Sequence, residues 1–378
     1  MVWAKTCTQD SQCNSSDGEM CARRTGQASG RCIPTWFGIC HGWTPASILE
    51  PEPRHAVVKN GVTFKVNDLK ALASLVHTQS TTKFVSLRCE QSRTNGMNFD
   101  DYGRPIDESC RDSNAGTYHL LLANFLGKRG QAFAEDRTVD SEVWNQPLRG
   151  FRVLQQKEVT AQEANRLIGV GITGGTTTNK TGSLAKGAWT QLGSFTVAAG
   201  QSFQVNMSGT GDADLYVKFG AAPSASAYTC RPYTSGSAEA CSGVVPAGQT
   251  TLFVAVNGYS ASTYKVAVSV GGSVPTSYFF NRNAAKFFYV KTDVDYISEE
   301  SAEDDGYKTP TIDRFTRTDH YEYILEVDAA GRIIGGEWVG DSKQAHPDFL
   351  WLPTGVSASS VDGIKFAEVK ALLTAAAQ

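Results

Sequence analysis

The sequence has no apolar run of roughly 18 residues, the length at which a membrane-spanning helix becomes feasible, so we predict no membrane span. It also lacks an excess of basic residues, because 35 Lys and Arg stand against 38 Asp and Glu, for a net charge of −3. Nucleic-acid-binding proteins normally carry a basic stripe, so we predict no nucleic-acid partner. No signal peptide is visible, and the start Met-Val-Trp is interpreted as that of a mature or trimmed secreted chain with an added Met.

The nine cysteines contain no Cys-x-x-Cys pair, the usual spacing of structural zinc sites. Four of them crowd the first 32 residues, which indicates disulfides and an oxidising, extracellular compartment. We interpret residues 1–33 as a small disulfide-rich module, in which four cysteines allow three pairings that the sequence does not distinguish. Local spacing predicts two more pairs, Cys89 with Cys110 and Cys230 with Cys241. Cys40 is left over.

Composition divides the 378 residues into several parts. Glycine-rich stretches at 171–183 and 271–277 are interpreted as linkers. Between them, residues 184–270 carry short alternating segments separated by turn signals, which predicts an inserted all-β sandwich. We therefore predict an α+β fold whose core comprises residues 34–170 and 278–378.

Within the core, Cys40 is predicted to begin a helix, because Pro45 is tolerated in a first turn and Pro51 marks an end. Apolar runs predict three strands, at 118–125, 131–137 and 143–153, the first two joined by a tight connection at 127–130. Other elements are predicted as helices capped by Asn67 and Thr160, strands at 286–297, 321–327 and 332–339, and a helix from Asp362.

A catalytic cysteine acts as its thiolate, which a helix N-terminus favours through its partial positive charge and free N–H groups. Papain-like enzymes combine such a cysteine with a histidine that begins a strand and an Asn or Asp on the next strand. On this arrangement we predict Cys40 as the nucleophile, His119 as the base and Asp136 as the orienting group. The offset of 17 residues between His119 and Asp136 suits an antiparallel hairpin in an antiparallel sheet. The structural alternatives for Cys40 are a buried free thiol and a disulfide partner that leaves another cysteine free.

Other residues compete for these roles. His41 adjoins Cys40, but neighbours on a helix point in different directions, so it is a poor base. His320 begins a second strand, whose hairpin partner also carries carboxylates, and the pattern alone does not separate it from His119. We prefer His119 because it shares an unbroken segment with Cys40. The alternatives to Asp136 as orienting group are Asp140 and Asn145.

The segment Val143-Trp-Asn-Gln-Pro-Leu-Arg-Gly-Phe-Arg-Val153 closely resembles the peptide elicitor surface of the oomycete transglutaminase elicitor family, whose pattern is Val-Trp-Asn-Gln-Pro-Val-Arg-Gly-Phe-Lys-Val. It departs from that pattern at Leu148 and Arg152. The resemblance extends over residues 34–170 and 278–378. Other segments similar to the family and its bacterial relatives are Ile39-Cys-His-Gly-Trp43, Cys110-Arg-Asp-Ser-Asn-Ala-Gly-Thr-Tyr-His119, Gly335-Gly-Glu-Trp338 and His346-Pro-Asp-Phe-Leu-Trp351.

The resemblance implies a secreted, calcium-dependent transglutaminase with a papain-like core and Cys40 as its nucleophile. Such an enzyme joins glutamine and lysine side chains of protein substrates through a thioester. Trp36, Trp43 and Trp144 are candidates for excluding water, although at least one of them is expected to be core packing. Two other classes stay open: a glutamine deamidase or papain-like protease, and a non-catalytic secreted binding protein.

Calcium would require oxygen ligands, which the acidic residues supply in number but without the spacing of an EF-hand. We interpret most of them as a solvated loop and assign no metal ligand. The residues considered are Asp293, Asp295, Glu299, Glu300, Glu303, Asp304 and Asp305, and in the sandwich Asp212 and Asp214.

Two segments of the sandwich have a different resemblance. Gly209-Thr-Gly-Asp-Ala-Asp-Leu-Tyr-Val-Lys-Phe-Gly220 and Tyr228-Thr-Cys-Arg-Pro-Tyr233 resemble the bacterial pre-peptidase C-terminal domain, a β-sandwich appended to secreted bacterial enzymes. This implies a bacterial relative of the elicitor family rather than an oomycete protein.

Overall fold

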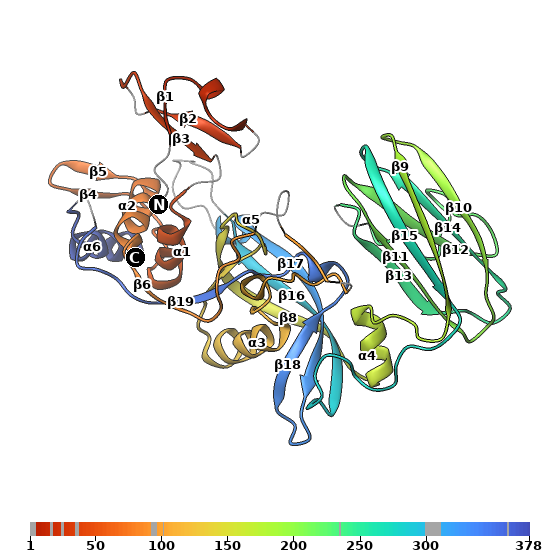
Figure 1. Ribbon diagram of the computed structural model, residues 1–378. Helices are drawn as coiled ribbons and strands as arrows, with labels where there is room; N and C mark the ends of the chain where they lie inside the picture. Colours follow the sequence, from red (N-terminus) through yellow and green to blue (C-terminus); the bar gives the residue numbers. More distant parts are fainter. Residues whose placement is uncertain are drawn as a thin grey trace.

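The structure is a computed structural model with three parts: a small N-terminal module, a core of helices around a large sheet, and a β-sandwich at the far end of the molecule from the helical side of the core (Figure 1). It describes residues 5–15, 18–23, 26–34, 38–91, 97–100, 102–233, 236–298, 311–360 and 363–378.

The N-terminal module is a three-stranded antiparallel sheet in the order β1-β3-β2. Its elements are β1 (Thr6–Cys7), the 3-10 turn η1 (Asp10–Gln12), β2 (Glu19–Ala22) and β3 (Gly30–Pro34). Cys7 pairs with Cys21, and Cys13 pairs with Cys32. The predicted disulfides are therefore confirmed, and the structure selects one of the pairings that the sequence left open.

A seven-stranded sheet, antiparallel at every pairing, is the centre of the core, in the order β18-β17-β16-β8-β7-β19-β6. Strands from before and after the sandwich pair with one another within it, as β8 does with β16 and β7 with β19, so the two core segments of the sequence make one sheet. The strands are β6 (Thr81–Phe84), β7 (Ala134–Asp136), β8 (Asn145–Val159), β16 (Lys286–Ile297), β17 (Thr316–Val327), β18 (Ile333–Trp338) and β19 (Leu350–Gly355).

Three helices pack together at one end of the core: α1 (Cys40–Leu49), α2 (Val66–His77) and α6 (Phe366–Ala376). Their shared core includes Ala46, Leu69 and Leu372. Cys40 begins a helix as predicted, whereas α2 is capped by Lys65 and Asn67 lies in its first turn. Among the residues that the structure describes, no helix combines the length and the apolar composition that a membrane span needs. Smaller elements are β4 (Val57–Lys59), β5 (Val62–Phe64), η3 (Glu108–Cys110), α5 (Thr311–Phe315) and η5 (Gly340–Lys343).

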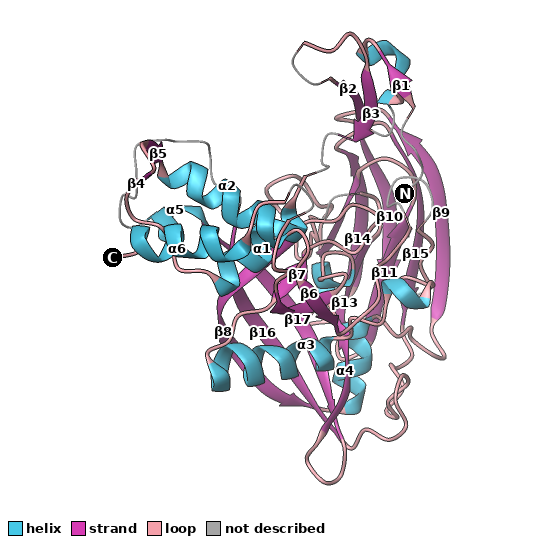
Figure 2. Ribbon diagram, turned by 90° about the vertical axis from the view of Figure 1, so that its left-hand side faces the viewer, coloured by secondary structure: helices cyan, strands magenta, loops and turns pink. Residues whose placement is uncertain are grey.

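The predicted strand at 118–125 is wrong, because this segment is helical. It forms α3 (Ala115–Leu121), which continues as a π-helix, η4 (Leu122–Arg129), ending at Gly130 with φ 59°. Asn114 caps α3 by accepting a hydrogen bond from the Thr117 N–H. Tyr118, Leu121, Leu122 and Phe125 recur at helical spacing and pack on the large sheet, which α3 crosses in Figure 2. The connection predicted at 127–130 lies at the end of this helix.

Two glycine-rich backbones meet where α3 packs on β18. A Cβ atom at Gly116 would collide with the carbonyl oxygen of Gly335, and one at Gly336 would lie 2.7 Å from the Gly116 nitrogen. The helix therefore lies directly on the strand, with no side chain between them. This contact explains physically why the sequence has paired glycines before Trp338.

The sandwich consists of a three-stranded sheet, β10-β14-β12, and a four-stranded sheet, β13-β11-β15-β9. A single cluster of buried aliphatic side chains, including Val205, Leu215 and Val266, lies between them. The stretch 171–183, interpreted as a linker, in fact supplies the edge strand β9, which pairs along the whole of β15. The strands are β9 (Thr176–Leu184), β10 (Trp189–Thr196), β11 (Ser202–Ser208), β12 (Ala213–Phe219), β13 (Glu239–Val244), β14 (Thr251–Gly258) and β15 (Ser262–Val270).

The helix α4 (Ala161–Ile168) connects the core to the sandwich and begins with the predicted cap, because the Thr160 hydroxyl accepts a hydrogen bond from the Glu163 N–H. The sandwich contacts the C-terminal end of this helix through Gln204, whose side-chain amide donates a hydrogen bond to the Gly169 carbonyl at 3.0 Å.

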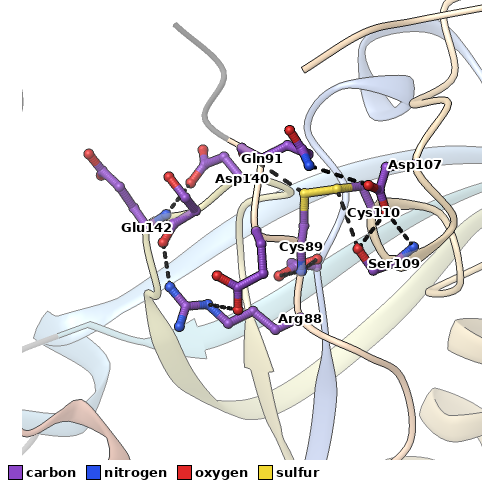
Figure 3. The surroundings of a disulfide bond; sticks show 11 residues. Arg88, Cys89, Gln91, Asp107, Ser109, Cys110, Asp140 and Glu142 are labelled. Atoms are coloured by element: carbon purple, nitrogen blue, oxygen red, sulfur yellow. Dashed lines mark hydrogen bonds and ion pairs between the residues drawn. A yellow bond between two sulfur atoms is a disulfide. The ribbon is translucent and has the colours of Figure 1, made fainter. Parts of the chain in front are cut away.

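The remaining disulfides also match their predictions: Cys89 pairs with Cys110 and Cys230 pairs with Cys241. Figure 3 shows the first of these with the polar loops around it, where Arg88 donates to the Ser141 carbonyl at 2.7 Å. The disulfide and this hydrogen bond tie the loop before α3 to the turn before β8.

We predict that Gly116→Ala lowers the free energy of unfolding by about 1–3 kcal/mol, because the added methyl group forces α3 away from β18. The measurement is the urea midpoint followed by tryptophan fluorescence. Gly127→Ala is the matched control, since its Cβ would meet the Phe151 ring at 3.5 Å, an ordinary contact, in the same helical segment. Equal midpoints for the two variants would contradict the close packing of helix and strand.

Candidate active site

Cys40 is the first residue of α1 and, among the nine cysteines, all of which lie in the described residues, the one without a disulfide partner. Its N-cap residue, Ile39, makes no side-chain hydrogen bond to the first turn. The thiol is partly exposed, at the end of the helix that carries the positive side of the helix dipole. This is the environment that favours a reactive cysteine over a packed structural one.

Asn145, the first residue of β8, lies beside this thiol. Its side-chain Nδ2 donates to the Cys40 Sγ at 3.6 Å, and the thiol donates to the Val143 carbonyl at 3.8 Å. The Asn145 side chain is buried, with 4% of its surface exposed. Cys40 therefore faces an amide donor that was predicted only as an alternative orienting group.

Trp351 on β19 determines which way the Asn145 amide points. The indole Nε1–H donates to the Asn145 Oδ1 at 2.7 Å. An indole N–H is only a donor, so the oxygen of the amide must face Trp351 and the nitrogen must face the sulfur. The whole set is anchored again by Thr44 on α1, whose hydroxyl donates to the Asn145 backbone carbonyl at 2.9 Å.

Asp136 lies next to Asn145 in the sheet, because the two residues are paired across β7 and β8. Its Oδ1 accepts a hydrogen bond from the Trp144 N–H at 2.7 Å, and its Oδ2 has no hydrogen-bond partner among the described residues. The carboxyl group is fully buried, and burial raises its pKa to about 7. Asp136 therefore supports the backbone before Asn145 and is largely protonated at mildly acidic pH.

Two further buried carboxyl groups flank this one. Burial raises the pKa of Glu135 to about 8, and Tyr118 donates a hydrogen bond to it at 2.9 Å. Burial also raises the pKa of Asp348 to about 8, and its carboxylate accepts from the Cys89 N–H at 2.8 Å. The two acids of β7 and Asp348, just before β19, are thus buried groups whose neutral form is favoured.

His119 does not lie beside Cys40 or Asp136 in this geometry. It is half-buried on α3, and its Nδ1 is 2.9 Å from the hydroxyl of Tyr323, which in turn bonds to Thr292. Thr292 pairs with Val153 on β8, eight residues after Asn145, or roughly 26 Å along the strand. Burial lowers the pKa of His119, so the imidazole is held neutral. The predicted hairpin between His119 and Asp136 is absent, because His119 lies within α3 and the helical turns of η4 follow it.

The other histidines also have partners away from the thiol. His320 on β17 is mostly exposed, and its Nδ1 lies 2.6 Å from Asp293 on β16. His77 contacts Glu50 and Ser80, and His346 stacks on the ring of Trp338. Across the described chain, which includes all six histidines, no imidazole is hydrogen-bonded to the Cys40 sulfur. The nearest in sequence, His41, is exposed on the first turn of α1.

The remaining candidates are Asp140, as an orienting group, and the three tryptophans considered for excluding water. Asp140 accepts from the Glu142 N–H at 2.8 Å and so shapes the turn before β8, as Figure 3 shows. Trp144 is 36% exposed, Trp43 is half-buried, and Trp36 lies outside the described residues.

Four of the acidic residues considered for calcium lie within the described residues. Asp293 and Asp295 form ion pairs with Arg152, at 3.3 and 2.6 Å. Asp214 in the sandwich pairs with Arg231, and the Asp212 backbone N–H is bonded to two serine hydroxyls. The five from Glu299 to Asp305 lie outside the described residues.

The model of the transglutaminase elicitor family matches residues 1–168 and 265–378. The chain belongs to the transglutaminase elicitor family. The match includes the N-terminal disulfide module and both segments that build the large sheet. Between them, the model of the bacterial pre-peptidase C-terminal domain matches residues 190–269.

A solved structure agrees with this assignment. The crystal structure of the GP42 transglutaminase from Phytophthora sojae is similar over 99% of this chain and 73% of that chain, with 30% identity and a TM-score of 0.60. This family member therefore shares its overall architecture with a transglutaminase.

The curated relatives match over a short stretch only. A zinc metalloprotease of Helicobacter pylori and the hemagglutinin/proteinase of Vibrio cholerae are each 54% identical over 67 residues, or 18% of this chain. The chain spans 26% and 11% of their lengths. With the disulfides and the pre-peptidase C-terminal match, these relatives indicate an extracellular protein of the elicitor family.

Asn145 and Trp351 are the residues that the sequence analysis undervalued. Both lie in segments noted for their resemblance to the elicitor family, 143–153 and 346–351, so the signal was present. Their role depends on a contact between residues 206 positions apart, which no local pattern reveals.

We predict that Asp136→Asn stabilises the chain at pH 8 relative to the wild type by roughly 2–4 kcal/mol and changes little at pH 4. The folded pKa, about 7, lies above the ordinary value of 3.8. The contribution of this proton to stability is complete below pH 3.8 and is lost as the pH rises to about 7. Asparagine keeps the acceptor for the Trp144 N–H without the buried charge.

The measurement is the urea midpoint at both pH values. Glu158→Gln, an exposed carboxylate on β8, is the control and should shift both midpoints alike. A uniform loss of stability in Asp136→Asn would show instead that the folded protein holds this carboxylate charged.

Proposed function

We propose that this chain is a secreted transglutaminase that joins protein glutamine and lysine side chains through a thioester on Cys40. One observation carries the proposal: a free thiol at the first residue of a helix, 3.6 Å from an oriented amide donor, in a chain of the transglutaminase elicitor family. The placement of α1 against β8 supports a papain-like core, with Cys40 opening the helix and the antiparallel sheet facing it.

In the first step, the Cys40 thiolate attacks the carboxamide carbon of a glutamine side chain. A carbon–sulfur bond forms, and negative charge develops on the carboxamide oxygen. The Asn145 Nδ2–H group lies within reach of an oxygen on the carbon bonded to sulfur, and Trp351 holds it in that orientation. A preorganised donor of this kind stabilises the oxyanion without reorganising during the reaction.

In the second step, the carbon–nitrogen bond breaks, and ammonia leaves with the proton that the base took from the Cys40 thiol. A lysine amine then attacks the thioester, the carbon–sulfur bond breaks, and the amine proton is released to the base. His119 as this base and Asp136 as its orienting group stay predictions. The contact of Asp136 with the backbone beside Asn145 supports a positioning role for the acid, whereas the contact of His119 with Tyr323 supports no direct role at the sulfur.

The domain arrangement follows the same proposal. Residues 34–170 and 278–378 form the catalytic core, residues 1–33 form a disulfide module, and the sandwich at 184–270 is an insertion. The family match on both sides of the sandwich supports this division. Calcium dependence stays a prediction from the family resemblance, without assigned ligands.

We predict that wild type incorporates monodansylcadaverine into a glutamine-containing protein and that Cys40→Ala abolishes incorporation, because the thioester can no longer form. The fluorescence of the labelled protein measures it. Ammonia release without incorporation would indicate a deamidase, cleavage of the substrate would indicate a protease, and equal activity in Cys40→Ala would remove this thiol from the mechanism.

The same assay identifies which histidine is the catalytic base. His119→Ala, His320→Ala and His41→Ala are compared under one condition, and the variant that lacks the true base should lose orders of magnitude in rate while the others lose little. Thermal unfolding of each variant serves as the control for folding.

We predict that Asn145→Ala lowers kcat for incorporation by about 10²–10³-fold with a smaller change in KM, as expected for loss of an oxyanion donor. Trp351→Phe keeps the ring but removes the N–H that orients the amide, so it should give a partial loss in the same direction. An Asn145→Ala variant with unchanged kcat would assign the amide a structural role.

A further inference from the structure

The outer face of the three-stranded sheet in the sandwich carries aromatic side chains where a solvent-facing sheet normally carries polar ones. Side chains alternate along β12, so Leu215 and Val217 enter the core between the sheets while Tyr216 points outward. Trp189 lies on the same outer face, because Trp189 and Asp214 both pair with Asn257 on β14, the strand between them.

The loop after β12 folds over this face and adds more rings. The centroids of Trp189 and Tyr216 are 4.6 Å apart, and those of Tyr216 and Tyr228 are 5.8 Å apart. The Arg231 guanidinium lies between the rings of Tyr216 and Tyr233, at 4.9 and 3.8 Å from their centroids. We call these five residues the aromatic platform.

The platform is accessible and rigidly held. The exposed fractions are 39% for Trp189, 46% for Tyr228 and 62% for Tyr233. The loop is fixed by the disulfide at Cys230 and by backbone hydrogen bonds of 2.8–3.1 Å between Val217 and residues 229–230. Arg231 is held by an ion pair of 3.0 Å with Asp214, whose side chain is 3% exposed.

Tyr233 has a backbone φ of 61°, in the left-handed region that large side chains rarely adopt. Such a conformation costs on the order of 1–3 kcal/mol and persists only where the surroundings enforce it, most often at ligand sites. Here the strained conformation holds an exposed ring flat against Arg231.

We propose that the aromatic platform binds a neutral polysaccharide. A pyranose ring has a face of C–H bonds, which packs on the electron-rich face of an aromatic ring, and a rim of hydroxyl groups, which both donate and accept hydrogen bonds. The platform offers the matching pair: the exposed rings of Trp189, Tyr228 and Tyr233, and beside them the Arg231 guanidinium donor, whose charge the buried Asp214 carboxylate neutralises. The absence of a net charge in this pair selects an uncharged chain over an acidic one.

The same ion pair disfavours the other occupants of an aromatic surface. A lipid surface or an apolar helix would cover Arg231, whose side chain is 21% exposed, without offering it a hydrogen-bond acceptor, at a cost in desolvation. A cationic ligand would be repelled by the Arg231 guanidinium, which lies over the rings of Tyr216 and Tyr233. A proline-rich peptide also packs on aromatic rings and is the rival that the experiment must separate.

The full chain is incubated with microcrystalline cellulose, an insoluble β-1,3-glucan and chitin, and the protein left in the supernatant is measured. We expect retention by at least one of them, and Trp189→Ala should weaken it roughly tenfold or more. Tyr233→Gly is the sharper variant, because it removes the ring and the backbone strain together. It should therefore bind less while its thermal stability is unchanged or higher.

Val244→Ala is the control, since Val244 lies on the other sheet of the sandwich. Its exposed fraction, 49%, is similar to the 46% of Tyr228. Cys40→Ala should bind as the wild type does, because the proposal does not depend on catalysis. No retention of the wild type, or equal retention of Tyr233→Gly, would overturn it. Retention on poly-L-proline resin that is lost in the same variants would reassign the platform to peptides.

Discussion

The pairing of β8 with β16 is the interaction on which the core depends. The ladder runs from Val159 with Phe287 to Leu148 with Tyr296, and it joins a strand that precedes the sandwich to one that follows it. Without it, the seven-stranded sheet would separate into two incomplete halves, each with unpaired backbone groups on a long edge. The sandwich can occupy the intervening sequence because both of its ends return to this ladder, next to α4.

The same long strand positions the candidate active site at its first residue. Asn145 is held by its ladder partner Asp136, by Trp351 from β19 and by Thr44 from α1. Three separate segments of the chain therefore hold one buried residue: β7 and α1 fix its backbone, and Trp351 fixes its side-chain amide. Cys40 meets that amide because α1 packs against the start of β8. An amide held in this way is preorganised, which is the property that electrostatic stabilisation of a developing charge requires. The buried acids behind it, Glu135 and Asp348, are stable in their neutral forms.

The two functional surfaces of the molecule depend on different physics. At Cys40, chemistry needs a fixed donor in a largely buried setting, and the protein provides it by long-range contacts to one side chain. On the sandwich, the aromatic platform needs exposed rings in fixed positions, and the disulfide at Cys230 and the ion pair of Arg231 with Asp214 provide that. The first surface belongs to the part matched by the transglutaminase elicitor family, and the second belongs to the pre-peptidase C-terminal segment within it.

Much of the structure followed from local sequence. The helix that begins at Cys40, the disulfides Cys89–Cys110 and Cys230–Cys241, the strand at 286–297 and most strands of the sandwich depend on local spacing, caps and alternation, whereas the two pairings within residues 1–33 were left open. The segment at 118–125 was misassigned because an unbroken apolar run fits a buried strand as well as a helix, and only packing on the large sheet made the helical period decisive. That error also produced the hairpin between His119 and Asp136.

The contents of the site were decided by the tertiary structure. The sequence predicted Cys40 as the free cysteine at a helix N-terminus, since nine cysteines leave at least one unpaired and the other eight fall into local clusters. It did not determine what lies beside the sulfur, because Asn145 is 105 residues away and Trp351 lies 206 residues beyond that. Those distances are closed by sheet register, and register is set by the burial of whole strand faces rather than by any pair of residues in sequence.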